Sequence, residues 1–221
     1  MIAIENELTE GAAGCAIGIL TVENLRCPNG QALRPIRHAL EAALREKYGT
    51  TARAELKSLH PMDAYISYYK KFGYTYHVLP QLESVARGKP IPDELPPVEV
   101  MFLAELKNML LTAGHDLDQI KAPIRLQVAD GKESYLSLSG RTVLTVPGDL
   151  MISDGESVIS SILRGPDSRT AITEQTTRFL YTVYAPAGVE EALIERHLSD
   201  MEEYVRLLSD ASVICRKEIF H

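Results

Sequence analysis

The chain has 221 residues, 45% of them hydrophobic, which is enough for the core of one sizeable domain or of two small ones. Its formal net charge of −7 argues against sequence-independent capture of phosphate backbones, so we expect no DNA partner. No apolar run reaches the roughly 18 residues needed to cross a bilayer, and the acidic N-terminus lacks the features of a secretory signal. We therefore expect a cytoplasmic protein without a membrane partner.

The first half of the chain predicts one strand followed by several helices. Residues 15–22 form a short β-branched run, interpreted as a buried strand that the turn signal Pro28-Asn29-Gly30 ends. Beyond this turn, apolar residues recur at helical spacing and predict a helix over about 31–48. Proline and glycine positions mark three further helices, at 61–73, at 80–86 and from 96 onward, of which the last is the most apolar.

From Ile124 onward, alternating apolar and polar residues predict half-buried antiparallel strands at 124–128, 135–138 and 143–146. Further strands are expected at 150–153, at 158–163 and at 179–185, where the run of β-formers is nearly continuous. An apolar stripe then predicts one long helix that covers the sheet, and a final strand adds to the sheet edge or returns to the N-terminal strand. We predict a single α+β domain over 1–221, with the N-terminal strand and helices at 10–115, a β-rich half at 120–186, the covering helix at 188–209 and the final strand at 212–219.

The three cysteines, Cys15, Cys27 and Cys215, cannot all pair within the chain and form no CxxC motif. We interpret them as reduced, buried, small apolar residues. Neither a zinc-ligand cluster nor a Ser-His-Asp signature is visible, so we expect no metal and no cofactor.

Four segments in series are more specific than this general pattern. They are Pro97-Val98-Glu99, Ala113-Gly114-His115-Asp116-Leu117-Asp118-Gln119-Ile120, Pro147-Gly148-Asp149-Leu150-Met151-Ile152-Ser153-Asp154-Gly155, and Ser160-Ser161-Ile162-Leu163-Arg164-Gly165-Pro166-Asp167-Ser168-Arg169-Thr170-Ala171-Ile172-Thr173. In order and spacing, from about Ser58 to Gly188, they resemble the editing module of the phenylalanyl-tRNA synthetase beta chain, particularly its stand-alone homologues. The resemblance implies a three-layer sandwich of two packed, mostly antiparallel sheets with helices.

The resemblance also implies a pocket that hydrolyses tyrosine wrongly attached to the phenylalanine tRNA, by means of a positioned water and not a covalent nucleophile. As hypotheses from the residues themselves, we assign catalytic roles to His115 and Asp167 and substrate-binding roles to Glu99, Arg164, Gly165, Arg169 and Thr170. The family usually has a histidine three positions before the aspartate that aligns with Asp116, where this chain has Ala113. His115 occupies a position that is usually aromatic.

His115 admits two interpretations from its own chemistry. It could orient a water or bind a substrate amine or hydroxyl, because histidine titrates near working pH. The alternative is a capping or hydrogen-bonded structural histidine at the end of a helix. Asp116 and Asp118 are interpreted as residues of an Asx turn that precedes a strand.

The loop from Arg164 to Thr170 offers two guanidinium groups and one carboxylate around a Gly-Pro turn. Such a loop can clamp a carboxylate or a phosphate through paired donors. The alternative is an internal ion pair between Asp167 and Arg169 that only shapes the loop. The turns at 147–149 and 153–155, with positive φ at glycine and aspartates bonding their own backbone, and the N-cap pattern of a helical turn at 173–176 are interpreted as structural.

An aromatic cluster could stack nucleic-acid bases while Lys70 and Lys71 contact phosphates. Its members are Tyr65, Tyr68, Tyr69, Phe72, Tyr74 and Tyr76, with His77 interleaved at the end. A helix face packed on the sheet is the alternative for Tyr65, Tyr69 and Phe72.

Two functions of different classes follow. The first is a free-standing hydrolase that deacylates mischarged aminoacyl-tRNA in trans, with a pocket between the sheets and the Arg164 to Thr170 loop at its rim. The second is a non-catalytic module that binds RNA, an aminoacyl group or a free amino acid, and alanine at position 113 favours it. We expect no charging of tRNA, because this module uses the whole chain and no room is left for an ATP-binding catalytic domain.

Overall fold

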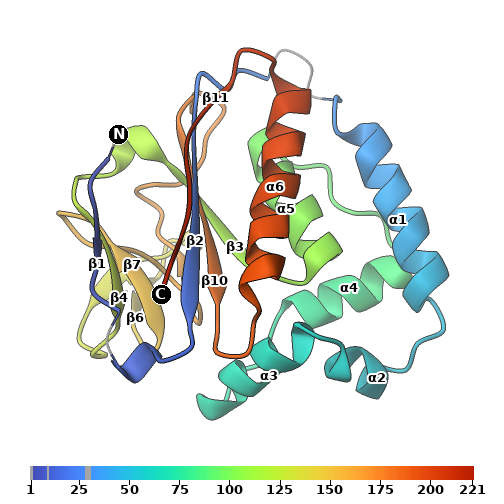
Figure 1. The fold of residues 1–221 in the computed structure, drawn as a ribbon, viewed down its shortest axis with the longest axis horizontal. Helices are drawn as coiled ribbons and strands as arrows, with labels where there is room; N and C mark the ends of the chain where they lie inside the picture. The colour runs from blue at the N-terminus through green and yellow to red at the C-terminus, as the bar shows by residue number, and fades with distance from the viewer. Residues whose placement is uncertain (1, 9, 28–30) are drawn as a thin grey trace.

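Two β-sheets and a group of helices lie side by side in three layers (Figure 1). The computed structural model describes residues 2–8, 10–27 and 31–221, so the predicted turn at Pro28-Asn29-Gly30 lies outside the described residues. A four-stranded sheet forms the middle layer, with a five-stranded sheet on one face and helices α5 (Pro96–Asn108) and α6 (Glu191–Leu208) on the other. The predicted α+β sandwich of two packed, mostly antiparallel sheets with helices is confirmed.

The middle sheet has the order β11-β2-β10-β3 and is antiparallel throughout. Its strands are β2 (Ala16–Glu23), β3 (Leu111–Asp116), β10 (Phe179–Ala185) and β11 (Val213–Phe220). Every residue of β10 is buried, because the other sheet covers one of its faces and the helices cover the other. This burial explains why its sequence is a continuous run of β-formers and not an alternating one.

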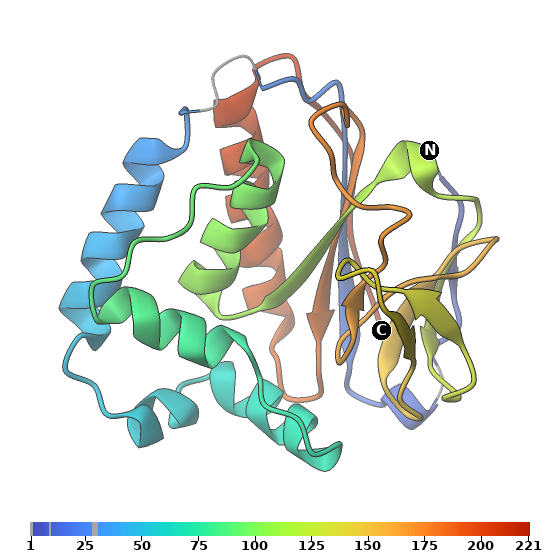
Figure 2. The same cartoon turned by 180° about the vertical axis from the view of Figure 1, so that it is seen from behind.

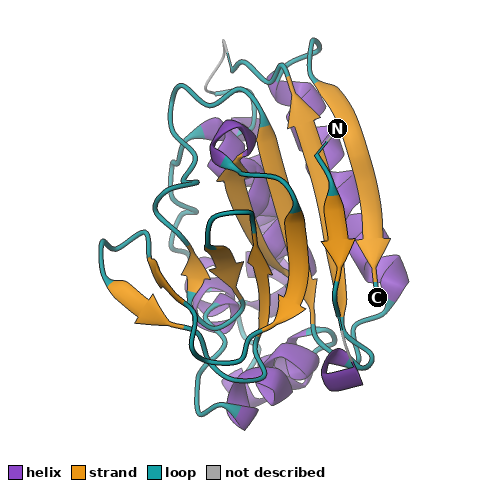
Figure 3. Ribbon diagram, turned by 90° about the vertical axis from the view of Figure 1, so that its left-hand side faces the viewer, coloured by secondary structure: helices purple, strands orange, loops and turns teal. Residues whose placement is uncertain are grey.

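The outer sheet has the order β1-β4-β7-β8-β9, and Figure 3 views the molecule from this side, with the helices behind. Its strands are β1 (Ile4–Asn6), β4 (Ile124–Val128), β7 (Leu150–Ser153), β8 (Val158–Ser161) and β9 (Gly165–Pro166). Only the β1–β4 pairing is parallel. A small hairpin of β5 (Ser134–Leu136) and β6 (Thr142–Leu144) lies beside this sheet and buries Tyr135 while it exposes Leu136 and Leu144.

The remaining helices pack around α5 and α6 (Figure 2). They are α1 (Arg34–Tyr48), α2 (Arg53–Ser58), α3 (Met62–Lys71) and α4 (Val78–Ala86), with short 3-10 helices at Glu10–Ala12 and Leu117–Gln119. One hydrophobic cluster runs through both sheets and the helices. Within the part of the chain that the structure describes, no helix is long and apolar enough to cross a membrane.

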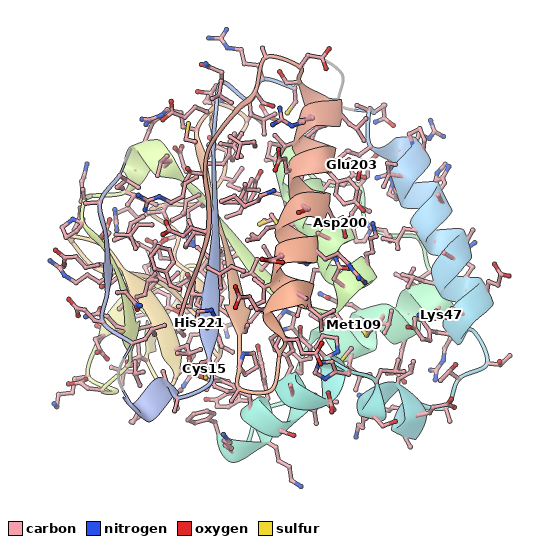
Figure 4. The ribbon with its side chains drawn as sticks, in the orientation of Figure 1. Cys15, Lys47, Met109, Asp200, Glu203 and His221 are labelled. Atoms are coloured by element: carbon pink, nitrogen blue, oxygen red, sulfur yellow. The ribbon has the colours of Figure 1, made fainter. Side chains whose placement is uncertain are left out.

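The strand β3 corrects the sequence analysis, which assigned residues up to 115 to the helical part and weighed His115 as the cap of a helix. Met109 ends α5 in a left-handed conformation (φ 58°), and the chain turns there into β3 (Figure 4). The strand then pairs with β10 from Leu111 opposite Tyr184 to Asp116 opposite Phe179. Its sequence contains alanine and glycine and few β-formers, so this pairing with a distant strand, and not local preference, makes it a strand.

Turn details confirm some predictions and correct others. Gly148 has positive φ (86°) as predicted, and Asp154 accepts the backbone N–H groups of Glu156 and Ser157. Gly155 does not have positive φ; glycine is needed there because a Cβ atom would lie 2.9 Å from the Ala122 carbonyl oxygen. Residues 173–176 form a hydrogen-bonded turn and not a turn of helix. The carboxylate of Asp149 accepts from the Tyr68 hydroxyl and the Leu163 N–H and not from its own backbone.

Candidate functional site

A pocket of about 390 Å³ lies where the two sheets meet the connection between α3 and α4. Its lining comes from Tyr69, Tyr74, Thr75 and His77, from residues 111–113 of β3, from residues 161–166 at and after the end of β8, and from Tyr184 of β10. The Tyr69 hydroxyl donates to the Ile162 carbonyl (2.9 Å) and so fixes α3 against the segment after β8. Residues distant in sequence thus form one concave site, of the size that small ligands occupy.

Arg164 lines this pocket, as does Gly165. The Arg164 guanidinium lies 5.2 Å from the centre of the Tyr74 ring, and its Nε donates to the Leu144 carbonyl at 3.0 Å. Toward the residues that the structure describes, its two terminal amino groups make no hydrogen bond. They are therefore available to a carbonyl or anionic oxygen of a ligand.

Five buried polar side chains form a continuous hydrogen-bonded chain that ends at the pocket, and we call it the buried polar chain. The Thr170 hydroxyl donates to Asp167 and lies 2.8 Å from His115 Nδ1. His115 Nε2 lies 3.2 Å from Ser160 Oγ, and Ser160 is hydrogen-bonded to the Tyr184 hydroxyl. The chain thus joins β3, β8 and β10 and brings together the predicted site residues His115, Asp167 and Thr170.

The donor and the acceptor of every hydrogen bond in the buried polar chain follow from the Asp167 carboxylate at one end of it. Thr170 has one hydroxyl proton and gives it to the Asp167 carboxylate, so His115 Nδ1–H must donate to Thr170. His115 Nε2 is then an acceptor, Ser160 donates to it, and Tyr184 donates to Ser160. Burial raises the pKa of Tyr184, so its hydroxyl keeps its proton. The Tyr184 oxygen therefore offers lone pairs, and no proton, to a ligand in the pocket.

The buried polar chain holds His115 in its neutral form. The ring is fully buried, and burial, with the nearby Arg169 cation adding to it, lowers the pKa of His115 to about 3. Burial also raises the pKa of Asp167, against the opposing effect of its bonds to Thr170. His115 reaches the pocket only through Ser160 and Tyr184 and cannot itself touch a ligand there.

Arg169 and Glu99, the other two predicted site residues, lie elsewhere. Arg169 donates to the Gln119 carbonyl (2.7 Å) and to the buried carboxylate of Asp154 (2.9 Å), and its Nε lies 3.8 Å from Asp167. These contacts shape the loop, as in the internal ion-pair alternative. Glu99 is buried 3.4 Å from Arg37 among the helices. Neither residue lines the pocket.

One residue that lines the pocket, His77, lies near a buried glutamate, Glu105, and the sequence analysis gave neither a catalytic role. His77 lines the pocket with its side chain 50% exposed, and its Nε2 lies 4.0 Å from Oε1 of Glu105. Glu105 is buried on α5, and its Oε2 accepts the Thr112 N–H at 3.1 Å. Burial raises the pKa of Glu105 to about 8. The one sequence signal for this pair was a glutamate, Glu105, within the most apolar of the predicted helices.

The aromatic cluster is mostly core. Tyr65, Tyr68, Tyr69 and Tyr76 are buried, and the rings of Tyr65 and Tyr76 stack with centroids 4.5 Å apart. The packing alternative is confirmed for Tyr65 and Tyr69, whereas Phe72 is only partly buried, and none of the four buried rings has a face free for a nucleic-acid base. Tyr74 is exposed and lies at the pocket beneath Arg164. Among the residues that the structure describes, no group of three or more His, Cys, Asp or Glu side chains is placed to hold a metal ion.

The comparisons with known proteins show a distant likeness of fold. No protein-family model matches the chain, and no curated protein matches it. Among solved structures, the chain is similar to an N-terminal fragment of the phenylalanyl-tRNA synthetase beta-subunit from Pyrococcus horikoshii, with 15% identity and a TM-score of 0.46. The match covers 57% of this chain and 47% of the fragment, so the chain spans about half the length of that relative. The likeness is a distant one of fold.

Proposed function

We propose that the chain is a free-standing, cytoplasmic aminoacyl-tRNA hydrolase that deacylates mischarged tRNA in trans. The observation that carries the proposal is the pairing of unlike polar groups in one pocket, with Arg164 as a free donor and Tyr184 as an acceptor without a proton to give. An aminoacyl ester presents the complementary pair, a carbonyl oxygen and an α-ammonium group. The sequence resemblance to the editing module supports the same reaction.

Arg164 and Tyr184 have distinct roles in this proposal. The free amino groups of Arg164 bind the ester carbonyl and stabilise the negative charge that develops on its oxygen when water attacks. The Tyr184 oxygen accepts a hydrogen bond from the α-ammonium group and so orients the ester. The buried polar chain behind Tyr184 fixes this orientation, because each of its protons is committed to one partner.

The attacking group in this proposal is water. Ser160 is fully buried, and its proton is committed to His115. Ser161 is buried as well. Neither serine is therefore suited to form a covalent intermediate.

Binding of tRNA to a chain of net charge −7 requires a local basic surface. Lys70 and Lys71 end α3, are exposed, and precede the pocket-lining residue Tyr74 by only a few positions. We propose that they contact phosphates next to the pocket, with an affinity that falls as salt rises.

The test is deacylation of the phenylalanine tRNA mischarged with tyrosine. We expect the purified protein to release tyrosine faster than buffer, and Arg164→Ala to lower kcat/KM by about 100-fold, as removal of one oxyanion donor does in other hydrolases. The control is Arg141→Ala, which removes an exposed arginine from the neighbouring hairpin and should match wild type. An intact ester at high protein concentration would exclude the hydrolase.

A second candidate is a binding module that holds an aminoacyl group or a free amino acid without turnover. The observation that favours it is that His115 and Tyr184 of the buried polar chain stay neutral, because burial lowers the pKa of His115 and raises the pKa of Tyr184. Calorimetric binding of tyrosine, or of its non-hydrolysable amide to adenosine, together with an intact ester in the deacylation assay, would establish this candidate.

A further inference from the structure

A histidine that lines the pocket lies near a buried carboxyl group. His77 is the last residue before α4, and Glu105 lies in the last turn of α5. The two come together because α4 begins and α5 ends close to the pocket, with His77 Nε2 4.0 Å from Glu105 Oε1. The His77 side chain is half-exposed, so a small rotation can shorten this distance to a hydrogen bond once a ligand fills the pocket.

The surroundings leave Glu105 as the acid nearest to this imidazole. The rings of Tyr69 from α3 and of Tyr76 contact His77 edge-on, at centroid distances of 6.4 and 5.7 Å. Tyr74 and Arg164 line the same pocket. Glu105 itself has the Thr112 N–H on its other oxygen, which holds the carboxyl in place toward His77.

We propose that His77 and Glu105 are the proton-transfer pair of the pocket, with His77 as the base that activates the attacking water and Glu105 as the residue that positions the imidazole and balances its charge. The proposal rests on the hydrolase function proposed above. It places the base at a position that does not correspond to any of the residues that the sequence resemblance singled out.

The proposed step balances without a cofactor. The imidazole nitrogen that faces away from Glu105 takes a proton from water as the water oxygen bonds to the ester carbonyl carbon. The bond from that carbon to the ribose oxygen then breaks, the electron pair goes to the ribose oxygen, and the imidazolium returns its proton there. The products are the free amino acid and the tRNA hydroxyl, and His77 ends neutral.

The pair has a characteristic pH dependence. Partial burial lowers the pKa of His77 from its ordinary value, so the ring is a free base at neutral pH. The Glu105 carboxylate stabilises the imidazolium only when ionised, and burial raises its pKa to about 8. The enzymatic rate above the uncatalysed rate should therefore rise as the pH increases from 6 toward 8.5.

The experiment compares wild type, His77→Gln, Glu105→Gln and the control His60→Gln in deacylation of mischarged tRNA across pH 6 to 9. His60 forms a second, solvent-exposed pair with Asp63 (3.1 Å) away from the pocket, so the control removes a similar pair. We expect His77→Gln to lower kcat by about 100-fold and Glu105→Gln by about tenfold, with the pH-dependent rise flattened in both. KM, the binding of a non-hydrolysable aminoacyl-adenosine amide and the circular dichroism should match wild type, as should every property of His60→Gln.

Three other outcomes would lead to different conclusions about the pair and about the hydrolase. If wild type hydrolyses the ester and His77→Gln keeps both its rate and its pH profile, the pair is overturned while the hydrolase stands. If His77→Gln loses activity together with analogue binding, His77 holds the ligand and is not the base. If wild type binds the analogue and leaves the ester intact, the hydrolase and the pair both fall.

Discussion

The two histidines at the pocket, His115 and His77, differ in burial and in hydrogen bonding. Behind the pocket-lining residue Tyr184, His115 is fully buried and both of its ring nitrogens are hydrogen-bonded. His77 lines the pocket and is half-exposed, and its nearest acid is 4.0 Å away. The difference teaches that burial and hydrogen bonding, and not residue type, decide whether a histidine supports a site or can take part in its chemistry.

The largest expected contrast between the two histidines is in stability. His115→Ala removes a buried ring and two hydrogen bonds, so we expect the free energy of unfolding to fall by about 3 kcal/mol. His77→Ala should change it by less than about 0.5 kcal/mol, because the side chain is half in solvent. Urea unfolding at pH 7.5 measures both, and similar costs for the two variants would contradict the distinction between the two histidines.

The next contrast is in how stability depends on pH, which reports on the buried His115. The pKa of His115 is lowered to about 3, whereas an unfolded histidine titrates near 6.5, so acid favours the unfolded chain between these values. From pH 7.5 to pH 5, wild type should lose about 2 kcal/mol more than His115→Gln. His197, which burial shifts in the same way, is present in both proteins and cancels. Parallel urea-unfolding curves at the two pH values would show that His115 is not held neutral.

Glu105 gives an effect of the opposite sign. Its pKa is raised from 4.5 in the unfolded chain to about 8, so wild type loses stability as the pH rises through this window. Glu105→Gln keeps an acceptor for the Thr112 N–H and should be about 3.5 kcal/mol more stable than wild type at pH 8, yet nearly equal to it at pH 5. Chemical denaturation at these two pH values measures the difference. A variant less stable than wild type at pH 8 would mean that the buried carboxyl is a structural requirement.

The two arginines of the Arg164 to Thr170 loop give the smallest contrast. Arg169→Ala removes the bonds to the Gln119 carbonyl and to the buried Asp154 carboxylate, and we expect it to cost about 1 kcal/mol. Arg164→Ala removes one backbone bond and a ring contact at the surface and should cost less than about 0.5 kcal/mol. Thermal unfolding checks the order, and a larger loss for Arg164 would make it a structural residue and not a ligand-binding one.

The sequence predicted most elements because their signals are local. Apolar residues at helical spacing define α1 and α6, alternation defines β4 and β7, and prolines mark the starts of α3 and α5. The strands β1 and β3 carry no such signal and were missed. Each exists because its backbone pairs with a partner strand far along the chain, β4 and β10 respectively.

The site could be predicted only in part, and the failures have one cause. Arg164 lies on a recognisable Gly-Pro turn, so its place at a pocket could be expected. Ser160 lies in an ordinary strand pattern, and nothing local marks it as the link between two predicted residues and the pocket. Glu99 and Glu105 lie on the same helix, yet the first pairs with Arg37 and the second lies beside the pocket residue His77.

By itself, the sequence determined which segments become helices and strands and which loop provides an arginine to a pocket, because these depend on neighbours within a few residues. Only the tertiary structure decided that His115 is buried and neutral and that His77 lines the pocket. His115 meets Thr170 across 55 residues and Ser160 across 45, and these distant contacts exclude water from its ring. The free energy of a proton on an imidazole depends on such exclusion, which no local pattern encodes.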